Sequence, residues 1–255
     1  MGSLHTCRLA LLVTLASTFI AMLTGCSTVN EGGGTAAAPT TSIQTLEYYP
    51  YQVKGYQNSY PRKTIVILVP ADAREVTGNA APLNGNPAIG IIVDQSGSIT
   101  ERLYSSPIGP IVQAAIGRSA DEAGLSASSS TDVTYKPGVK NTTEYVLESK
   151  IRRCWVKKER STSGQNGPIW RTMADFALDI SIYKPPFSVP FWTGSTDDTY
   201  FDPPVGSFGL GSEDEAGIYD EPGQVMSVAL TRTVAAIFQR QDLRNLVLED
   251  DIKSR

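Results

Sequence analysis

The sequence predicts an α+β domain in which an antiparallel β-sheet carries two main helices on one face. Three observations lead to this expectation. Two long stretches with alternating apolar residues follow each other without a helix between them, which predicts a β-hairpin. Two other stretches have the apolar spacing of helices, one in the middle of the chain and one near its end. We expect one such domain over residues 45–255.

The first strands are predicted from short apolar runs. Residues 65–69 are five consecutive aliphatic residues closed by Pro70, which is typical of a strand buried on both faces. Residues 89–93 form a second apolar run, and residues 99–104 can return beside it. Ser96-Gly97 would then supply the turn of a hairpin.

The first helix is expected between Ser106 and Gly124. Ser106 can cap it, Pro107 suits its first turn, and Gly124 can end it. The second helix is predicted from the apolar positions Met226, Leu230, Val234, Ile237 and Phe238. It should end near Gln241, where Asp242 could cap a short last helix.

The long hairpin is predicted from residues 145–155 and 169–183. In its second strand one face is almost entirely apolar, and consists of Trp170, Ala174, Phe176, Leu178, Ile180 and Ile182. The opposite face is polar and carries Arg171, Asp175, Asp179 and Ser181. We therefore expect one face of this hairpin to pack on the helices and the other to meet water.

Residues 187–222 are interpreted as an acidic insertion without secondary structure, because the segment is rich in Pro, Gly and Asp and shows no periodicity. It contains no basic residue, and its acids are Asp197, Asp198, Asp202, Glu213, Asp214, Glu215, Asp220 and Glu221. It also holds several aromatic residues. We selected Phe191, Trp192, Tyr200 and Phe201 as candidates for contact with a partner protein.

The N-terminal residues have the layout of a secretory signal. Arg8 is followed by an apolar span of about 14 residues, shorter than the roughly 20 that a membrane-spanning helix needs. The span ends in Leu23-Thr24-Gly25-Cys26, which resembles the lipobox of bacterial lipoproteins. The resemblance implies that residues 1–25 are a signal peptide and that Cys26 carries the lipid. Ser27 then favours the outer membrane, because an aspartate there retains such proteins at the inner membrane.

Residues 26–44 are expected to form the lipidated N-terminus and a disordered tether, because three consecutive glycines and few apolar side chains cannot support a packed core. Loss of residues 1–25 removes one basic residue, Arg8, and leaves 21 basic and 26 acidic side chains, a net charge of −5. This balance argues against nucleic acid as a partner.

The cysteine and histidine content excludes several kinds of active site. The one histidine, His5, leaves with the signal, so the mature chain cannot build a Ser-His-Asp or Cys-His site. Only Cys154 remains as a free thiol, and we interpret it as a small strand residue. We expect no enzyme activity and no cofactor.

The sharpest metal-like motif is Asp94-x-Ser96-x-Ser98, directly after an apolar strand. Domains of the von Willebrand A type bind magnesium through such a loop, but their helices alternate with parallel strands. Here one helix precedes a β-hairpin, so we interpret the motif as a turn, with Asp94, Ser96 and Ser98 as weak metal candidates only. The acidic insertion likewise lacks the spacing of a calcium loop.

Taken together, the order of these features resembles the YajG-type family of outer-membrane lipoproteins. The resemblance rests on the lipobox, the strand followed by Asp72-Ala73-Arg74, the hairpin before Ser106-Pro107-Ile108, the helix closing at Gly124, the long hairpin and the C-terminal helix. It implies a βαββα-like domain, which is also found in auxiliary lipoproteins of lipid transport. The chain departs from the family in its tyrosine-rich segment before residue 60 and in its acidic insertion.

These observations predict a non-enzymatic lipoprotein, anchored in the outer membrane by its N-terminal lipid and facing the periplasm. Its expected role is that of a structural or accessory subunit in envelope assembly, with an envelope protein as partner. The alternative is a lipid- or glycan-binding module of an envelope transport system. An apolar groove between helices and sheet would favour the alternative, and a filled core would favour the accessory role.

Overall fold

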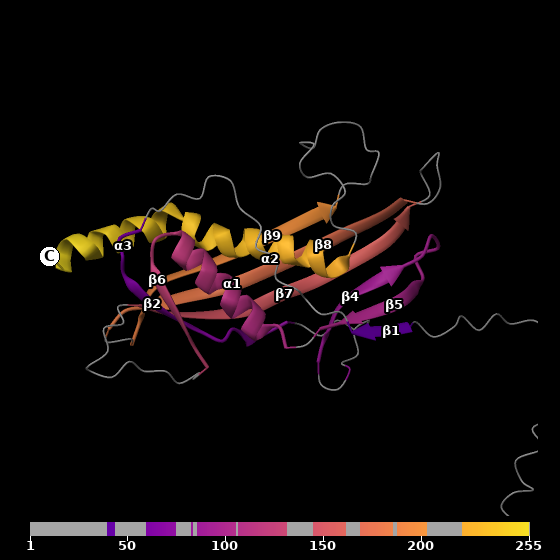
Figure 1. Ribbon diagram of the computed structural model, residues 1–255, viewed down its shortest axis with the longest axis horizontal. Helices are drawn as coiled ribbons and strands as arrows, with labels where there is room; N and C mark the ends of the chain where they lie inside the picture. Colours follow the sequence, from indigo (N-terminus) through magenta and orange to yellow (C-terminus); the bar gives the residue numbers. More distant parts are fainter. Residues whose placement is uncertain are drawn as a thin grey trace, which may run out of the picture. The chain divides into compact units, whose positions relative to one another are not determined.

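The described part of the chain comprises residues 40–43, 60–74, 83, 86–105, 107–131, 145–161, 169–185, 188–202 and 221–254 of a computed structural model. Its strands are β1 (Thr40–Ile43), β2 (Thr64–Leu68), β3 (Ala71–Asp72), β4 (Ala88–Val93), β5 (Ile99–Tyr104), β6 (Ser126–Ser130), β7 (Tyr145–Ser161), β8 (Ile169–Tyr183) and β9 (Pro190–Asp202). Its helices are α1 (Gly109–Glu122), α2 (Pro222–Gln239) and α3 (Gln241–Ser254). Figure 1 shows these elements from one side.

Strand β7 joins all the described strands into one sheet. One edge of β7 pairs in succession with β2, β3 and β4, each time in parallel orientation. The other edge pairs with β8 in antiparallel orientation, and β9 adds antiparallel to β8. Beyond these strands, β6 lies parallel to β2, while β5 lies antiparallel to β4 and parallel to β1. Both edges of β7 are therefore in use.

The sheet is mixed, so the expectation of an antiparallel sheet is wrong. Both hairpins were predicted correctly, because β4–β5 and β7–β8 are local and antiparallel. The parallel pairs join segments that are far apart in the sequence, such as Ile65 with Tyr145. No local pattern specifies such a pair. A strand buried on both faces, as expected for residues 65–69, is nevertheless typical of parallel pairing.

The aliphatic strand β2 is followed by a short connection that extends its pairing with β7. The amide of Ala73 donates to the carbonyl of Ile151 at 3.0 Å. Next to it, the Arg74 guanidinium holds the Asp72 carboxylate through two hydrogen bonds of 2.8 and 2.6 Å. The Arg74 side chain is only 8% exposed. This ion pair stands beside β7 between the segments that pair with β3 and with β4.

Helix α1 ends at the predicted glycine. Gly124 has φ +104°, a conformation that other residues rarely adopt, and the amide of Leu125 closes the last turn on Ala120 at 3.0 Å. The amide of Tyr60 donates to the carbonyl of Ala123 at 3.1 Å. The helix begins at Gly109, while the expected cap, Ser106, lies outside the described residues.

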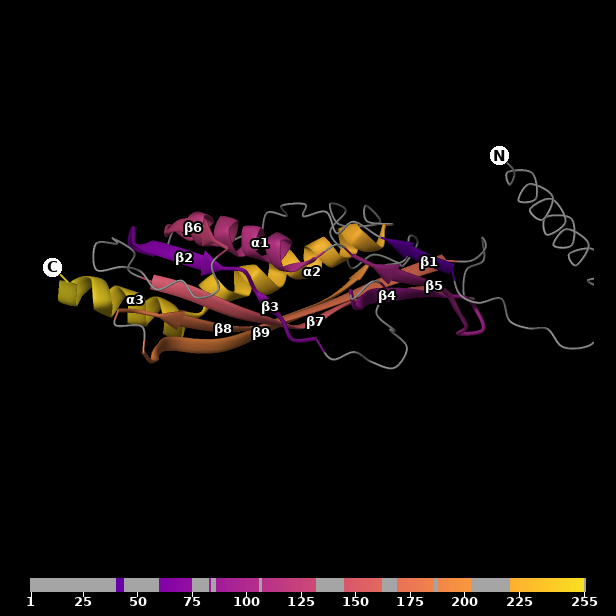
Figure 2. The ribbon, with the colours of Figure 1, turned by 90° about the horizontal axis from the view of Figure 1, so that it is seen from below.

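The helices α1 and α2 cover the same face of the sheet, as predicted (Figure 2). Helix α2 packs on β7, β8 and β9, whereas α1 packs on β2 and β6 and on the side of α2. Fourteen of the 18 residues of α2 are buried, many more than the five of its predicted stripe. The third helix, α3, continues from α2 after Arg240, and it buries Leu243 and Val247.

Two expectations about irregular segments are wrong where the structure describes them. Residues 190–202 of the predicted acidic loop form β9, while residues 203–220 lie outside the described part. The strand pattern was hidden because its inward positions, Trp192, Gly194, Thr196, Asp198 and Tyr200, mix apolar and polar side chains. Thr40–Ile43 of the predicted tether form β1, which needs only backbone hydrogen bonds to β5.

Gly90 permits the close approach of β4 to β7. A Cβ at Gly90 would lie 2.9 Å from the carbonyl carbon of Val156 and closer still to its oxygen. We predict that Gly90→Ala lowers the free energy of unfolding by about 1–3 kcal/mol, because the backbone of β4 or of β7 at Val156 must move to make room for the methyl group. The matched control is Gly117→Ala in α1, whose Cβ would meet only Ile67 Cδ1, at 3.6 Å. Denaturant titration should show this control unchanged or up to about 1 kcal/mol more stable.

Candidate functional site

The face of β7, β8 and β9 opposite the helices is polar. It owes its arrangement to an irregularity in β7, where the register with β8 shifts between Ile151 and Arg153. Consecutive residues of a regular strand point to opposite faces. Because of the shift, Arg152 and Arg153 are both exposed, at 42% and 48%, between the buried Ile151 and Cys154. The β-bulge therefore doubles the basic charge at one point of this face.

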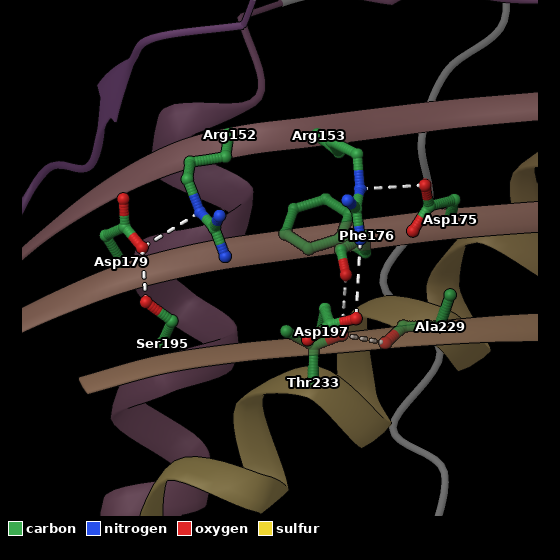
Figure 3. A network of polar contacts seen from close by, with 9 residues as sticks. All are labelled: Arg152, Arg153, Asp175, Phe176, Asp179, Ser195, Asp197, Ala229 and Thr233. Atoms are coloured by element: carbon green, nitrogen blue, oxygen red, sulfur yellow. Dashed lines mark hydrogen bonds and ion pairs between the residues drawn. The ribbon is translucent and has the colours of Figure 1, made fainter.

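Three aspartates of the neighbouring strands pair with these two arginines, and one serine donates to one of the aspartates (Figure 3). Arg152 Nε pairs with Asp179 Oδ1 at 2.9 Å, and the Ser195 hydroxyl donates to the same oxygen at 2.6 Å. Arg153 Nε pairs with Asp175 Oδ2 at 2.8 Å, and its Nη2 lies 3.4 Å from Asp197 Oδ2. Basic residues on β7 thus face acidic residues on β8 and β9. We call Arg152, Arg153, Asp175, Asp179, Ser195 and Asp197 the outer network.

Sequence reasoning did not predict the outer network, although it predicted the polar face of β8. The signal that could have revealed it is the pair Arg152-Arg153 between two buried residues, because two consecutive charges interrupt the alternation of a strand. The network holds two arginines and three aspartates, so most of its charge is paired within the sheet and a single negative charge remains. Exposed pairs of this kind stabilise a fold by only about 0–1 kcal/mol each.

Two clefts flank the outer network. One, of about 350 Å³, lies where β7 and β8 meet the end of β2, with Glu148, Lys150, Ser181 and Tyr183 in its wall. The other, of about 460 Å³, lies at the opposite end of β7, beside the β4–β5 turn. Its wall combines acidic and basic side chains, namely Asp94, Lys157, Glu159, Arg160 and Arg171.

The Asp94 motif forms the turn between β4 and β5, in the wall of the second cleft. One carboxylate oxygen, Oδ1, accepts hydrogen bonds from the amides of Ser96 and Ser98 at 2.8 and 2.9 Å and from the Ser96 hydroxyl at 2.6 Å. These hydrogen bonds, that of the Ser96 hydroxyl first, lower the pKa of Asp94. Gly97 has φ +81°, as the turn requires. The three candidate metal ligands are therefore held together by their own turn.

No group of three His, Cys, Asp or Glu side chains that could hold a metal occurs among the residues that the structure describes. Cys154 is buried between the sheet and α2, with its sulfur 3.9 Å from that of Met226. Burial raises the pKa of Cys154 to about 12, so its thiol is neutral at ordinary pH. Cys26, the predicted lipid attachment site, lies outside the described residues.

The four aromatic partner candidates are placed in very different surroundings. Trp192 and Tyr200 point inward from β9 and are only 6% and 7% exposed. Phe191 is half-buried, and its ring lies 5.5 Å from that of Tyr145. Phe201 points away from the helices and is 62% exposed. Of the four, Phe201 alone presents most of its side chain to solvent.

Trp192 fixes the junction between α2 and α3. Its Nε1 donates to Asp242 Oδ2 at 3.0 Å, and Arg240 pairs with the same carboxylate at 3.0 and 3.2 Å. The hydrogen bonds from Arg240 and Trp192 lower the pKa of Asp242 well below its ordinary value. The ring of Trp192 also covers Gly194, where a Cβ would lie 2.6 Å from Cζ2. Any larger residue at 194 would displace this ring.

Asp198 also points inward from β9, toward α2. Its Oδ2 is buried without a hydrogen-bond partner, and burial raises the pKa of Asp198, against the attraction of Arg232. The guanidinium of Arg232 lies 4.8 Å from the ring centroid of Tyr200. Among the described strands β9 pairs only with β8, so this half-buried acid stands on an edge strand of the sheet.

None of the described helices is both long and apolar enough to span a bilayer. No family model matches the chain. No curated protein matches it either.

Several solved structures are similar to the chain at low identity. A DUF330-family protein from Xanthomonas campestris has 12% identity and a TM-score of 0.45, over 82% of this chain and 99% of that one. A candidate neuraminyllactose-binding hemagglutinin homolog from Helicobacter pylori has 12% identity and a TM-score of 0.43, with the same coverage. A candidate lipoprotein from Caulobacter crescentus has 10% identity and a TM-score of 0.30, over 65% and 92%. Identities and TM-scores this low do not indicate a shared function.

The positions of Trp192 and Phe201 lead to opposite expectations for two aromatic residues of one strand. We predict that Trp192→Ala lowers the free energy of unfolding by about 3–5 kcal/mol, because it empties a buried site and leaves Asp242 without its indole donor. The matched control, Phe201→Ala, should change it by no more than about 0.5 kcal/mol. Denaturant titration of both variants checks this. Similar losses for the two variants would contradict the inward placement of Trp192.

The turn role of Asp94 leads to a second prediction. We expect Asp94→Ala to lower the melting temperature because the amides of Ser96 and Ser98 lose their acceptor. The decrease should be the same in EDTA and in magnesium, with Gln95→Ala, an exposed neighbour in the same turn, as the control. A melting temperature of the parent that falls in EDTA, and does not fall in Asp94→Ala, would show a metal site instead.

Proposed function

We propose that the protein is a lipid-anchored envelope lipoprotein without enzyme activity, acting as a structural or accessory subunit. The observation that carries the proposal is the sequence Leu23-Thr24-Gly25-Cys26 at the end of a short apolar segment. Ser27 favours the outer membrane, with the domain on the periplasmic face. The likeness to the YajG-type family belongs to this proposal, as does an envelope protein as partner.

The packing between helices and sheet supports an accessory role over a binding module. The side chains that meet there are large and have little or no exposed surface, with Phe176, Leu178, Ile180, Leu230 and Ile237 at 0–2%. Thr233 in this layer donates to the carbonyls of Ala229 and Phe176 at 2.8 and 3.3 Å (Figure 3), whereas Asp198 Oδ2 beside α2 is buried without a hydrogen-bond partner. Where the structure describes it, this layer is filled by side chains, which speaks against an acyl chain or a sugar ring between the helices and the sheet.

The outer face supports the same role for a different reason. The outer network pairs most of its charges within the sheet, and both clefts beside it are lined mainly by polar and charged side chains. Three apolar residues take part in each wall, Leu68, Val69 and Ala71 in one and Ile91, Val93 and Ile99 in the other. A ligand pocket usually combines an apolar wall with a few polar groups. This face is better suited to stay solvated, or to meet another protein through complementary polar contacts.

The anchor is tested by Cys26→Ser in the native host. We expect the variant to lose its lipid, measured as the mass of the N-terminal peptide, and to leave the outer-membrane fraction. The control is Cys154→Ser, which removes the other cysteine of the mature chain and should retain both the lipid and the membrane location. Retention of Cys26→Ser in the outer membrane, at the mass of the cleaved chain, would contradict the lipoprotein proposal.

A further inference from the structure

The end of the sheet where β7 leads into β8 is basic. We call Lys157, Lys158, Arg160, Trp170 and Arg171 the hairpin tip. Within residues 157–160 and 169–171 the one acid is Glu159, which pairs with Lys157 at 2.5 Å. The neighbouring β4–β5 hairpin adds the acids Asp94 and Glu101 and the base Arg102, and β9 adds Asp202, opposite Thr172, so that five bases stand against four acids. The hairpin tip therefore keeps a positive surplus in a chain whose mature net charge is negative.

The hairpin tip also exposes a tryptophan. Trp170 is 40% exposed, and Lys158 Nζ lies 5.6 Å from the centroid of its ring. The ladder places Arg160 directly opposite Trp170. Tryptophan is enriched at membrane–water interfaces, where its ring lies among the headgroups and neighbouring lysine and arginine side chains reach phosphate. An exposed tryptophan flanked by these two bases is thus suited to a lipid surface.

Strand β1 brings the N-terminal segment to the same end of the sheet. The register aligns Thr40 with Glu101 of β5, Glu101 with Ile92 of β4, and Ile92 with Lys158 of β7. Three strand spacings separate Thr40 from Lys158, or about 14 Å. Because β1 runs parallel to β5, the chain enters β1 from the end that holds the β4–β5 turn (Figure 1). The hairpin tip and the entry point of the tether are therefore neighbours.

The tether is short enough to keep this end of the sheet near the bilayer. Thirteen residues, 27–39, separate Cys26 from β1. Thirteen residues can reach no more than about 45 Å, whatever their conformation. Anionic headgroups attract basic residues only within about a Debye length of the surface, roughly 10 Å at 0.1 M salt. The tether therefore permits the hairpin tip to reach the headgroups, and the attraction acts once the tip is there.

We propose that the hairpin tip binds the anionic phospholipid surface of the membrane that holds Cys26, with Trp170 at the headgroup level. The proposal rests on the lipid anchor of the proposed function. It gives the anchored domain a defined orientation, with β1 and the tip toward the bilayer. Helix α3 lies at the other end of the sheet from β1 (Figure 2), so that this end would face away from the membrane.

The test measures Trp170 fluorescence in the lipidated full-length mature protein. The protein is reconstituted in vesicles of phosphatidylcholine and phosphatidylglycerol in equal parts, with bromine on the phosphatidylglycerol acyl chains as quencher. The quenching of Trp170 is the difference between the parent and Trp170→Phe. We expect it to be present, to be lost in pure brominated phosphatidylcholine, and to be lost at high salt while the protein still floats with the vesicles.

A triple variant tests the role of the bases. Lys158→Gln/Arg160→Gln/Arg171→Gln should float with the vesicles through its lipid but lose the quenching of Trp170. The matched control, Arg62→Gln/Arg118→Gln/Lys253→Gln, removes the same charge from exposed positions elsewhere and should retain it. If the tip variant does not unfold cooperatively and is therefore misfolded, the loss of Trp170 quenching in the parent at high salt still tests whether the bases are needed.

The possible failures of the two proposals can be distinguished. A chain that carries no lipid on Cys26 and does not float with vesicles overturns the proposed function. A lipidated chain that floats, but whose Trp170 is not quenched, overturns the orientation alone. Equal quenching in the tip variant and in its control also overturns the orientation, because the bases would then play no part.

Discussion

The fold depends on the backbone hydrogen bonds along the two edges of β7. A strand has only two edges, and here one is occupied by β8 along its whole length while the other is shared by β2, β3 and β4. Each of these partners comes from a different part of the chain. Loss of pairing along β7 would therefore separate the β2–β6 part of the sheet from the β4–β5–β1 part, although each part forms its own local contacts. The buried helix α2 reinforces the joint, since it packs on β7, β8 and β9 together.

Local features of the fold could be predicted from the sequence, because they depend on residues close together in the chain. The β4–β5 hairpin, the β7–β8 hairpin and the glycine that ends α1 all follow from a turn residue beside a periodic apolar pattern. The parallel pairs could not be predicted, because they depend on which distant strand pairs most favourably with one edge of β7. The residue pattern within a single strand does not indicate which distant strand will pair with it.

The candidate surfaces were harder to predict than the elements that carry them. Trp192 and Phe201 looked alike in the sequence, as aromatic residues of one acidic segment, yet one lies under α3 and the other in solvent. They differ because Trp192 is at an inward position of β9 and Phe201 at an outward one. The alternation was hard to recognise in the sequence because Asp198 and Gly194 also occupy inward positions. The outer network likewise depends on one extra residue in β7, which turns Arg152 and Arg153 to the same face. Such details follow from register, and register is fixed by tertiary pairing.

The inward-facing acid of β9 has a consequence for assembly. An edge strand offers unpaired amides and carbonyls to any other chain, and a long one invites polymerisation through sheet addition. A newcomer that extended this sheet beyond β9 would have to enclose the half-buried Asp198 carboxylate, which already lacks a hydrogen-bond partner at Oδ2. Burying this carboxylate further without a hydrogen-bond donor for Oδ2 is unfavourable. Asp198 therefore makes the free edge of β9 a poor template for a further strand, and so acts against open-ended growth of the sheet.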